Sequence, residues 1–289
     1  ARRERTRMQR HLLHKTWHAV LPGRGVLALE GRDTRKLLQG LVTSDVTALE
    51  EGGQPQHTAF LAHNGRMLFD AFLIPGHDAG SVLVEAEAAA IPALAAHLRR
   101  YKLRSKVTFT DRTDEFAVVA ICGHDAAASA AAAMTAESGA AWADARSQIS
   151  GLEALGYRQL VPRGSLAAAA SVLPPAAPAE LHGLLSALLG VPDGAADMPS
   201  GECVPHESNL ELLGSIHFAK GCYLGQELTA RTEFRGTVRK RLVPVVRAGG
   251  AAGGAAGGGG SGEAEAECVP ALSHLPAAER RLAAQLLPP

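Results

Sequence analysis

The sequence predicts an α+β fold with mixed or antiparallel sheets, and three observations point to this class. Asn64-Gly65 separates two apolar, β-type runs, which is a strong signal for a β-hairpin. Strand-like and helix-like segments follow one another without the regular alternation of a doubly wound parallel sheet. No Gly-x-Gly-x-x-Gly motif follows a predicted strand, so the residues do not indicate a dinucleotide-binding fold.

The first half of the chain predicts strands around two helices. Asp33 is placed to cap a helix that runs through Leu41, and an amphipathic pattern predicts a second helix over residues 88–100. The spacing of apolar residues predicts strands over residues 26–29, 57–63, 66–74, 81–87 and 106–110.

The second half predicts more helix. Strands are expected over residues 116–121 and 156–162, with an alanine-rich helix over 125–138 and another over 178–189. Residues 224–234 have helical spacing, with Glu227 and Arg231 placed as an i,i+4 ion pair.

Composition excludes several classes of protein. The 289 residues include 29 Lys and Arg and 29 Asp and Glu, so the chain has no global positive field for holding nucleic acid or an anionic membrane, and no nucleic-acid partner is expected. No apolar run is long enough for a membrane span. The four cysteines form no Cys-x-x-Cys pair, which argues against a zinc ribbon, a redox dithiol or a disulfide framework.

The two ends differ in composition from the middle. Residues 1–18 carry six basic side chains against the single acid Glu4, which resembles the remains of an organellar transit peptide; a solvated basic arm is the alternative. Residues 248–289 contain a run of Gly and Ala and are expected to be a flexible linker with a short tail. The remaining domain spans residues 19–247.

Residues 220–223 carry the most informative chemistry. A cysteine beside a glycine can sit on a tight turn with its sulfur exposed, and Lys220 and the start of the following helix would favour the thiolate of Cys222. The alternative is a buried cysteine that packs as a small apolar residue, which is common for free cysteines.

The segment Lys-Gly-Cys-Tyr-Leu-Gly-Gln-Glu at residues 220–227 resembles the KGCYxGQE signature of the YgfZ/Caf17-like folate-binding family. That family shares the fold of the aminomethyltransferase (GcvT, or T protein) of glycine cleavage. The resemblance extends over about residues 20–247, and is supported by Leu38 to Asp45, Asn64 to Asp70, Pro205 to Asn209, and Arg239 to Leu242.

The resemblance implies an iron–sulfur cluster assembly factor that supports maturation of [4Fe-4S] proteins. It implies an A-type scaffold protein and client apoproteins as partners, and a pocket for tetrahydrofolate. Cys222 would be a cluster ligand or reactive thiol, with positive charge from Lys220 and Arg231. The other implied roles are the turn for Gly221 and Gly225, the shape and hydrogen bonding of the site for Tyr223, Gln226 and Glu227, and the pterin pocket for Asp45, Glu207 and Asn209.

Each implied role has a structural alternative. Asp45 would simply cap the next element, and Glu207 and Asn209 would be loop and cap residues. Glu227 and Arg231 would form an ordinary solvated helix pair. One departure from the family pattern is that its C-terminal β-barrel is truncated or missing here, because Val243 to Val246 leads directly into the Gly/Ala run.

Three functions remain open on this basis. The first is an assembly factor without turnover of its own, acting through a cluster shared at Cys222. The second is a folate-dependent aminomethyl or one-carbon transferase with Asp45 as general base. The third is a degenerate family member that serves as a structural subunit of an organellar complex. The expected location is the mitochondrial matrix, with the chloroplast stroma as the alternative.

Overall fold

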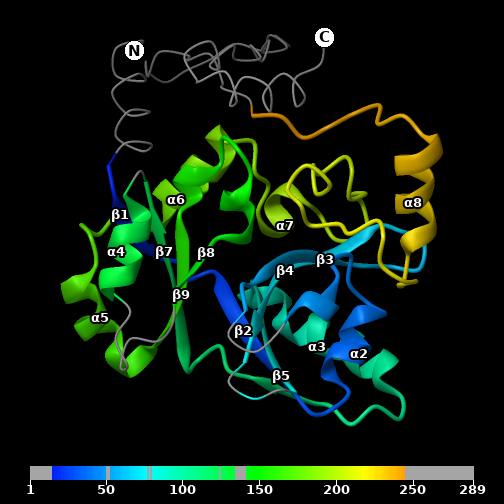
Figure 1. Cartoon of the computed structure of the whole chain (residues 1–289), viewed down its shortest axis with the longest axis horizontal. Helices are drawn as coiled ribbons and strands as arrows, with labels where there is room; N and C mark the ends of the chain where they lie inside the picture. Colours follow the sequence, from blue (N-terminus) through cyan, green and yellow to red (C-terminus); the bar gives the residue numbers. More distant parts are fainter. Residues whose placement is uncertain are drawn as a thin grey trace, which may run out of the picture.

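Two antiparallel sheets lie beside each other in the computed structural model (Figure 1). The structure describes residues 15–49, 53–76, 78, 80–123, 125–133 and 141–244. The α+β class and the antiparallel sheets are therefore confirmed. All pairs between named strands are antiparallel, so the mixed alternative is not observed in the described residues.

The larger sheet has the strand order β3-β4-β5-β2-β6. The strands are β2 (Arg24–Glu30), β3 (Gln56–Leu61), β4 (Met67–Pro75), β5 (Ser81–Glu87) and β6 (Thr108–Asp111). The helices α2 (Thr34–Gln39) and α3 (Ile91–Lys102) pack on this sheet. Leu38, Leu94 and Leu98 contact the inward side chains Phe60 and Leu73 in one core cluster. Asn64-Gly65 turns the chain between β3 and β4, as the sequence predicts.

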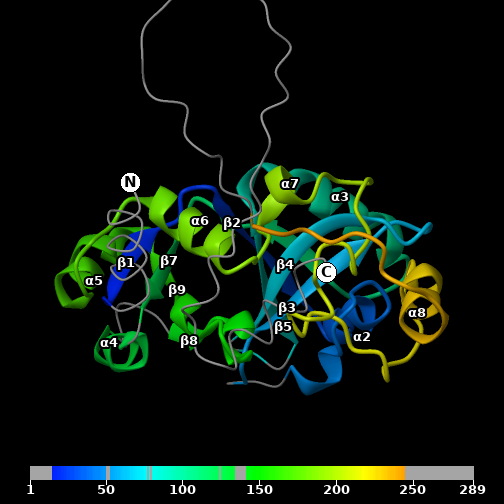
Figure 2. The same ribbon diagram turned by 90° about the horizontal axis from the view of Figure 1, so that it is seen from above.

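The smaller sheet has the order β1-β7-β9-β8. Its strands are β1 (Trp17–Val20), β7 (Phe116–Cys122), β8 (Ala141–Ala143) and β9 (Tyr157–Pro162). The alternation along β7 separates two cores, because Val119 and Ile121 face α4 (Ala126–Ala133) and α5 (Leu166–Val172). Val118 and Ala120 belong to the core that contains α6 (Ala179–Leu188) and the larger sheet. Both faces of this sheet are therefore covered (Figure 2).

The structure adjusts several boundaries. β1 begins at Trp17, inside the range 1–18 assigned to a basic arm, and its Trp17 side chain is buried. Residues 1–14 and 245–289 lie outside the described part, so the transit-peptide and linker predictions concern residues that are not described. Residues 239–242 form no strand, and neither sheet closes into a barrel within the described residues.

The segment after α6 returns to the larger sheet mostly as turns. It contains α7 (Gly194–Asp197) and ends in α8 (Gln226–Arg235) at the edge of the molecule (Figure 1). Short 3-10 turns complete the list: Val46–Ala48, Ala88–Ala90, Ala145–Gln148, Glu153–Leu155 and Arg163–Ser165. Among the described residues, no helix has the length and apolar character that a membrane crossing requires.

Candidate functional site

The candidate site is the loop of residues 215–225, here named the Cys222 loop. Cys222 is exposed, whereas the next residue, Tyr223, is buried. The thiol lies outside the helix that follows, because α8 begins at Gln226 and is capped by Gly225. The exposed position is one of the two alternatives that the sequence leaves open for Cys222, and the expected placement at a helix N-terminus is wrong by several residues.

The Cys222 loop is bound along its length to residues 40–44. Thr43 is the centre of this contact: its hydroxyl donates to the Ser215 carbonyl at 2.7 Å, and its carbonyl accepts from the His217 N–H at 2.9 Å. Further along, the Leu224 N–H donates to the Gly40 carbonyl at 3.0 Å. Residues 38–45 and 220–227, which are far apart in sequence, therefore form one structural unit that presents an exposed thiol.

Lys220 fastens the loop rather than standing free beside the thiol. Its ammonium group donates to the carbonyl oxygens of Val42 at 2.8 Å and Ser44 at 2.7 Å. It also lies 5.0 Å from the centre of the Tyr223 ring. Burial lowers the pKa of Lys220 to about 8, because the charged ammonium loses water, while Asp45 acts in the opposite direction. These contacts give Lys220 a positioning role, and its predicted role as a positive charge near the thiol stays a prediction.

The two glycines of the motif have different roles. Gly225 has a φ of 78°, and a Cβ at this position would lie 2.3 Å from the Ala62 carbonyl oxygen. Gly225 also packs against Gly65 at the tip of the β3–β4 hairpin, so that glycine at both positions allows close approach of the two backbones. Gly221, in contrast, has open space around the position of a Cβ. Only Gly225 is required by the local geometry.

The remaining motif residues support the start of α8. The Gln226 side-chain oxygen accepts from the Tyr223 N–H at 3.3 Å, and Tyr223 packs in an apolar cluster with Met67 and Leu210. Glu227 and Arg231 form an exposed ion pair one helical turn apart. This pair matches the alternative of a solvated helix pair, and the predicted contribution of Arg231 to positive charge near the thiol stays a prediction.

The three residues expected in a pterin pocket each bind other parts of the chain. The Asp45 carboxylate accepts from the Thr47 hydroxyl and N–H and from Gln39, which lower its pKa, with the Thr47 bonds acting most strongly. This is the capping role that the sequence offers as an alternative. Glu207 lies 3.5 Å from the Lys240 ammonium, and Asn209 donates to the Leu242 carbonyl at 2.9 Å. Glu207 and Asn209 therefore hold residues 239–242 in place.

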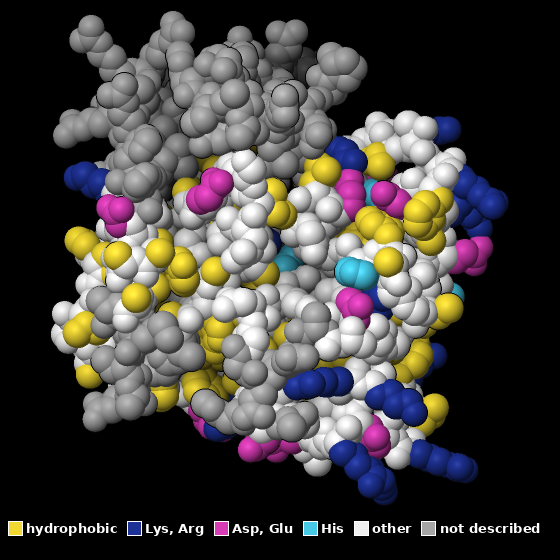
Figure 3. Space-filling model, viewed as in Figure 1, with side chains coloured by type: hydrophobic (Ala, Val, Ile, Leu, Met, Phe, Trp, Pro, Cys, Tyr) yellow, Lys and Arg dark blue, Asp and Glu magenta, His cyan; other side chains and the backbone are white. Residues whose placement is uncertain are grey.

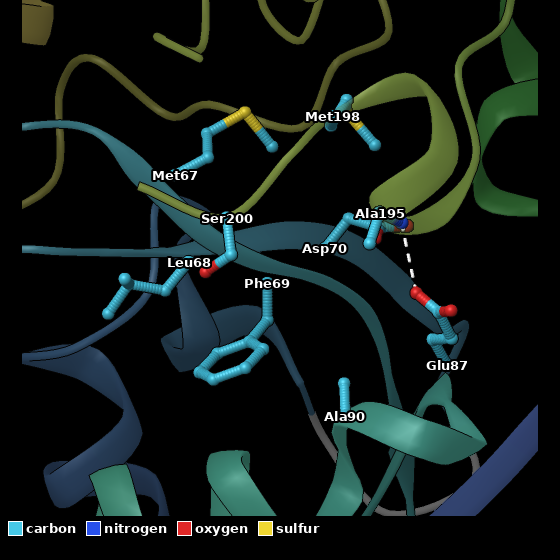
Figure 4. Close-up of a pocket in the computed structure, with 9 residues that line it drawn as sticks. All are labelled: Met67, Leu68, Phe69, Asp70, Glu87, Ala90, Ala195, Met198 and Ser200. Carbon is cyan, nitrogen blue, oxygen red and sulfur yellow. Dashed lines mark hydrogen bonds between the residues drawn. The ribbon is translucent and has the colours of Figure 1, made fainter. Parts of the chain in front are cut away.

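A small pocket lies between β4 and the α7 region, lined by Met67, Leu68, Phe69, Asp70, Glu87, Ala90, Ala195, Met198 and Ser200 (Figure 4). Glu87 closes one side by accepting from the Ala195 N–H at 2.9 Å. The pocket encloses about 70 Å³. Ligand sites of drug-sized molecules enclose about 300–1,000 Å³, so this pocket does not fit a tetrahydrofolate. This pocket therefore gives no support for tetrahydrofolate, and binding of that cofactor by this chain stays a prediction.

The sequence analysis missed a buried ion network between the two sheets. Arg24 and Arg158 both donate to Glu85, which joins β2 and β5 of the larger sheet to β9 of the smaller. Arg158 also donates to Asp144 at 2.9 Å, and Arg146 donates to the same carboxylate at 2.9 Å. All five side chains are buried. The sequence feature that could have indicated this network is a charged residue within an apolar strand, at Glu85 and at Arg158.

Electrostatics inside this network favour the charged forms of its members. Burial alone would raise the pKa of Asp144, but Arg146 and Arg158 hold that pKa far below its usual range. The guanidinium groups of Arg146 and Arg158 lie 4.8 Å and 4.3 Å from the centre of the Phe72 ring. Nearby, burial lowers the pKa of His182 to about 4, with Arg158 acting in the same direction. The network therefore consists of fixed charges that join two sheets.

The described residues contain no group of three or more His, Cys, Asp or Glu side chains that could hold a metal ion. Cys122 is buried, and burial raises the pKa of its thiol to about 12. Cys203 is half-buried against the cluster that contains Tyr223. Among the cysteines of the described part, Cys222 is thus the exposed one.

Known proteins resemble both the sequence and the fold. Residues 24–154 match the family model described as the GCVT N-terminal domain. The chain is 39% identical over 245 residues to the mitochondrial iron–sulfur cluster assembly factor IBA57 homolog of Mycosarcoma maydis, a match that covers 80% of this chain and 57% of that protein. It is 35% identical over 241 residues to the human mitochondrial iron–sulfur cluster assembly factor IBA57, covering 78% and 65% respectively.

The chain belongs to the family of the IBA57 proteins. It spans about 57% of the length of the Mycosarcoma relative. Among solved structures, the glycine cleavage aminomethyltransferase T of Bartonella henselae matches with a TM-score of 0.57 at 17% identity, over 71% of this chain and 60% of that one. This match confirms the GcvT-like fold that the sequence predicts.

Proposed function

We propose that this chain is an iron–sulfur cluster assembly factor that holds a cluster jointly with a partner protein through Cys222. The observation that carries the proposal is an exposed thiol on a loop whose backbone is fixed on both sides of it. The proposal is supported by the IBA57 relatives, whose names describe mitochondrial cluster assembly factors.

A cluster bound through Cys222 would need further protein ligands from a partner. A [4Fe-4S] or [2Fe-2S] cluster takes four protein ligands, mostly thiolates. The described residues offer Cys222 as one exposed thiol and no ligand group around it. The other ligands would come from a cysteine-bearing partner, for which an A-type scaffold protein is the candidate, with [4Fe-4S] apoproteins as the recipients. The relatives' names place this activity in mitochondria, and the matrix is the proposed location.

The chain's own contribution is positioning. Lys220 and Thr43 hold the loop against residues 40–44, and Gly225 fixes its exit into α8. An anchored loop presents the thiol with little loss of conformational freedom when a cluster binds. The transferase alternative has less support, because Asp45 already caps a 3-10 turn with the carboxylate that would act as base.

The test is anaerobic reconstitution with iron and sulfide, with and without an A-type scaffold protein. Visible absorbance reports the cluster, and size-exclusion chromatography reports the complex. We expect a cluster-dependent complex in the wild type and its loss in Cys222→Ser. Cys203→Ser is the matched control and should retain the complex. A complex that persists in Cys222→Ser, or that never forms in the wild type, would contradict the proposal.

A further inference from the structure

Charge is unevenly distributed on this neutral chain. The segment of residues 99–106 contains five basic side chains and no acid, and residues 32–36 add three more basic side chains beside Asp33. We name the combined region the basic surface. Its members are Arg32, Arg35, Lys36, Arg99, Arg100, Lys102, Arg104 and Lys106, together with Leu103.

The two segments of the basic surface are in contact. The Lys106 N–H donates to the Asp33 carboxylate at 2.7 Å, immediately before α2. Gly31 packs closely on the segment between α3 and β6. A Cβ at Gly31 would lie 2.0 Å from the Lys106 carbonyl oxygen. Lys and Arg side chains gather at the lower right of Figure 3, over the region where Figure 1 places α2 and the chain after α3.

The basic side chains are not neutralised by neighbours. Six of the eight are exposed, and no ion pair between described residues involves any of the eight. The acids on adjacent segments are Glu30, Asp33 and Asp78, so positive charge is in excess. The helix dipole accounts for the basic residues in the last turns of α2 and α3, but not for Arg32, Arg104 and Lys106.

Leu103 adds a feature that folding does not explain. Its side chain is 88% exposed, the largest exposure among the large apolar residues of the described part. Its φ is 45°, in the left-handed region that a leucine rarely occupies. The protein therefore holds an aliphatic side chain in solvent, in an unfavourable backbone conformation, between Lys102 and Arg104.

We propose that the basic surface docks on an anionic lipid bilayer, with Leu103 entering the boundary between headgroups and acyl chains. Cations near a membrane surface gain from anionic headgroups, and burial of an aliphatic side chain at the interface adds to that attraction. A single-stranded nucleic acid site would offer aromatic rings for stacking, whereas Tyr101 is half-buried and packs on His97 at 5.1 Å. A protein interface would need a wider apolar centre than one leucine among eight cations.

The test uses the full chain and sedimentation with two kinds of vesicle: phosphatidylcholine alone, and phosphatidylcholine with about one fifth cardiolipin. We expect binding to the anionic vesicles alone, weakening as salt is added. Replacing Arg99, Arg100 and Arg104 together with Gln should weaken binding about 100-fold, since each cation contributes about fivefold. The matched control replaces Arg231, Arg235 and Arg239 on and after α8 with Gln, and should bind as the wild type does.

Leu103→Gly separates docking from folding. Glycine accepts the positive φ, so the free energy of unfolding should stay the same or rise, while vesicle binding falls about fivefold to tenfold. Val172→Ala, at an exposed apolar residue outside the surface, should change neither. Equal binding to neutral vesicles, or full binding by the triple Arg variant, would overturn the proposal. So would competition by duplex RNA together with an unchanged Leu103→Gly, which would assign the surface to a polyanion instead.

Discussion

The Cys222 loop and the buried ion network use polar groups in opposite ways. In the network, Glu85, Asp144 and three arginines pair with one another between two sheets and are shielded from water. In the loop, the polar contacts are formed by backbone carbonyls with Lys220 and Thr43, and the thiol of Cys222 is left exposed. The comparison shows that buried charges join the two sheets, whereas hydrogen bonds to backbone carbonyls hold the Cys222 loop and leave its thiol at the surface.

The largest expected effect comes from breaking the network. Asp144→Ala leaves Arg146 and Arg158 buried without their shared partner, and removal of one member of a buried pair costs about 3–5 kcal/mol. Urea unfolding should show this loss in the free energy of unfolding. Cys222→Ser, which changes an exposed side chain, should stay within about 0.5 kcal/mol of the wild type. A loss under about 1 kcal/mol in Asp144→Ala would show that the two sheets do not depend on the network.

The pH dependence of stability gives the next effect. Because the pKa of His182 is about 4 in the folded state and 6.5 in the reference state, the unfolded chain binds the proton first. Stability from this group is complete above pH 6.5 and is lost as the pH falls toward 4, by up to about 3 kcal/mol. The free energy of unfolding, measured with urea at several pH values in this window, should depend less steeply on pH in His182→Leu than in the wild type. His63→Leu, at an exposed histidine, is the control. An equal pH dependence of the free energy of unfolding in both variants would show that His182 does not cause the effect.

The two glycines of the motif offer a matched pair. Gly225→Ala must adopt a φ of 78° and approach the Ala62 carbonyl, so we expect a loss of about 2 kcal/mol or more in the free energy of unfolding. Gly221→Ala meets open space and should change stability by less than about 0.5 kcal/mol. Thermal or urea unfolding of the two variants measures both changes in stability. Equal losses would mean that the loop is not held as the structure shows.

The smallest effect is expected at the exposed helix pair. Glu227→Gln removes the ion pair with Arg231, and such pairs contribute under about 0.5 kcal/mol. We also expect cluster-dependent complex formation to remain. A large loss of the complex with unchanged stability would instead give Glu227 a direct role with the partner.

Much of the fold follows from local sequence patterns. The hairpin at Asn64-Gly65 and the strand β5 were predictable, because turn residues and apolar alternation are read within a few neighbouring positions. β1 was not, since Trp17 to Val20 directly follow a basic run and gain their burial from α6 and the larger sheet. Strand β8, with three residues, carries too little periodicity to be recognised.

Some features of the candidate site could likewise be predicted from local sequence, and others could not. Cys222 could be singled out from its motif, and the adjacent Gly221 made an exposed position one of two alternatives. The partners of Lys220 could not be inferred, because the carbonyl oxygens of Val42 and Ser44 are supplied by a segment almost 180 residues away in sequence. Asp45, Glu207 and Asn209 show the reverse case: their residue types suit a ligand, but local caps and residues 239–242 already engage them.

The most direct test of the account is to measure Cys222→Ser in both kinds of assay on one preparation. Urea unfolding reports the fold, and anaerobic co-elution with an A-type scaffold protein at visible wavelengths reports the shared cluster. We expect an unchanged free energy of unfolding and complete loss of the cluster-dependent complex. A variant that keeps both the fold and the complex would contradict the central claim that the exposed thiol of the Cys222 loop holds the cluster.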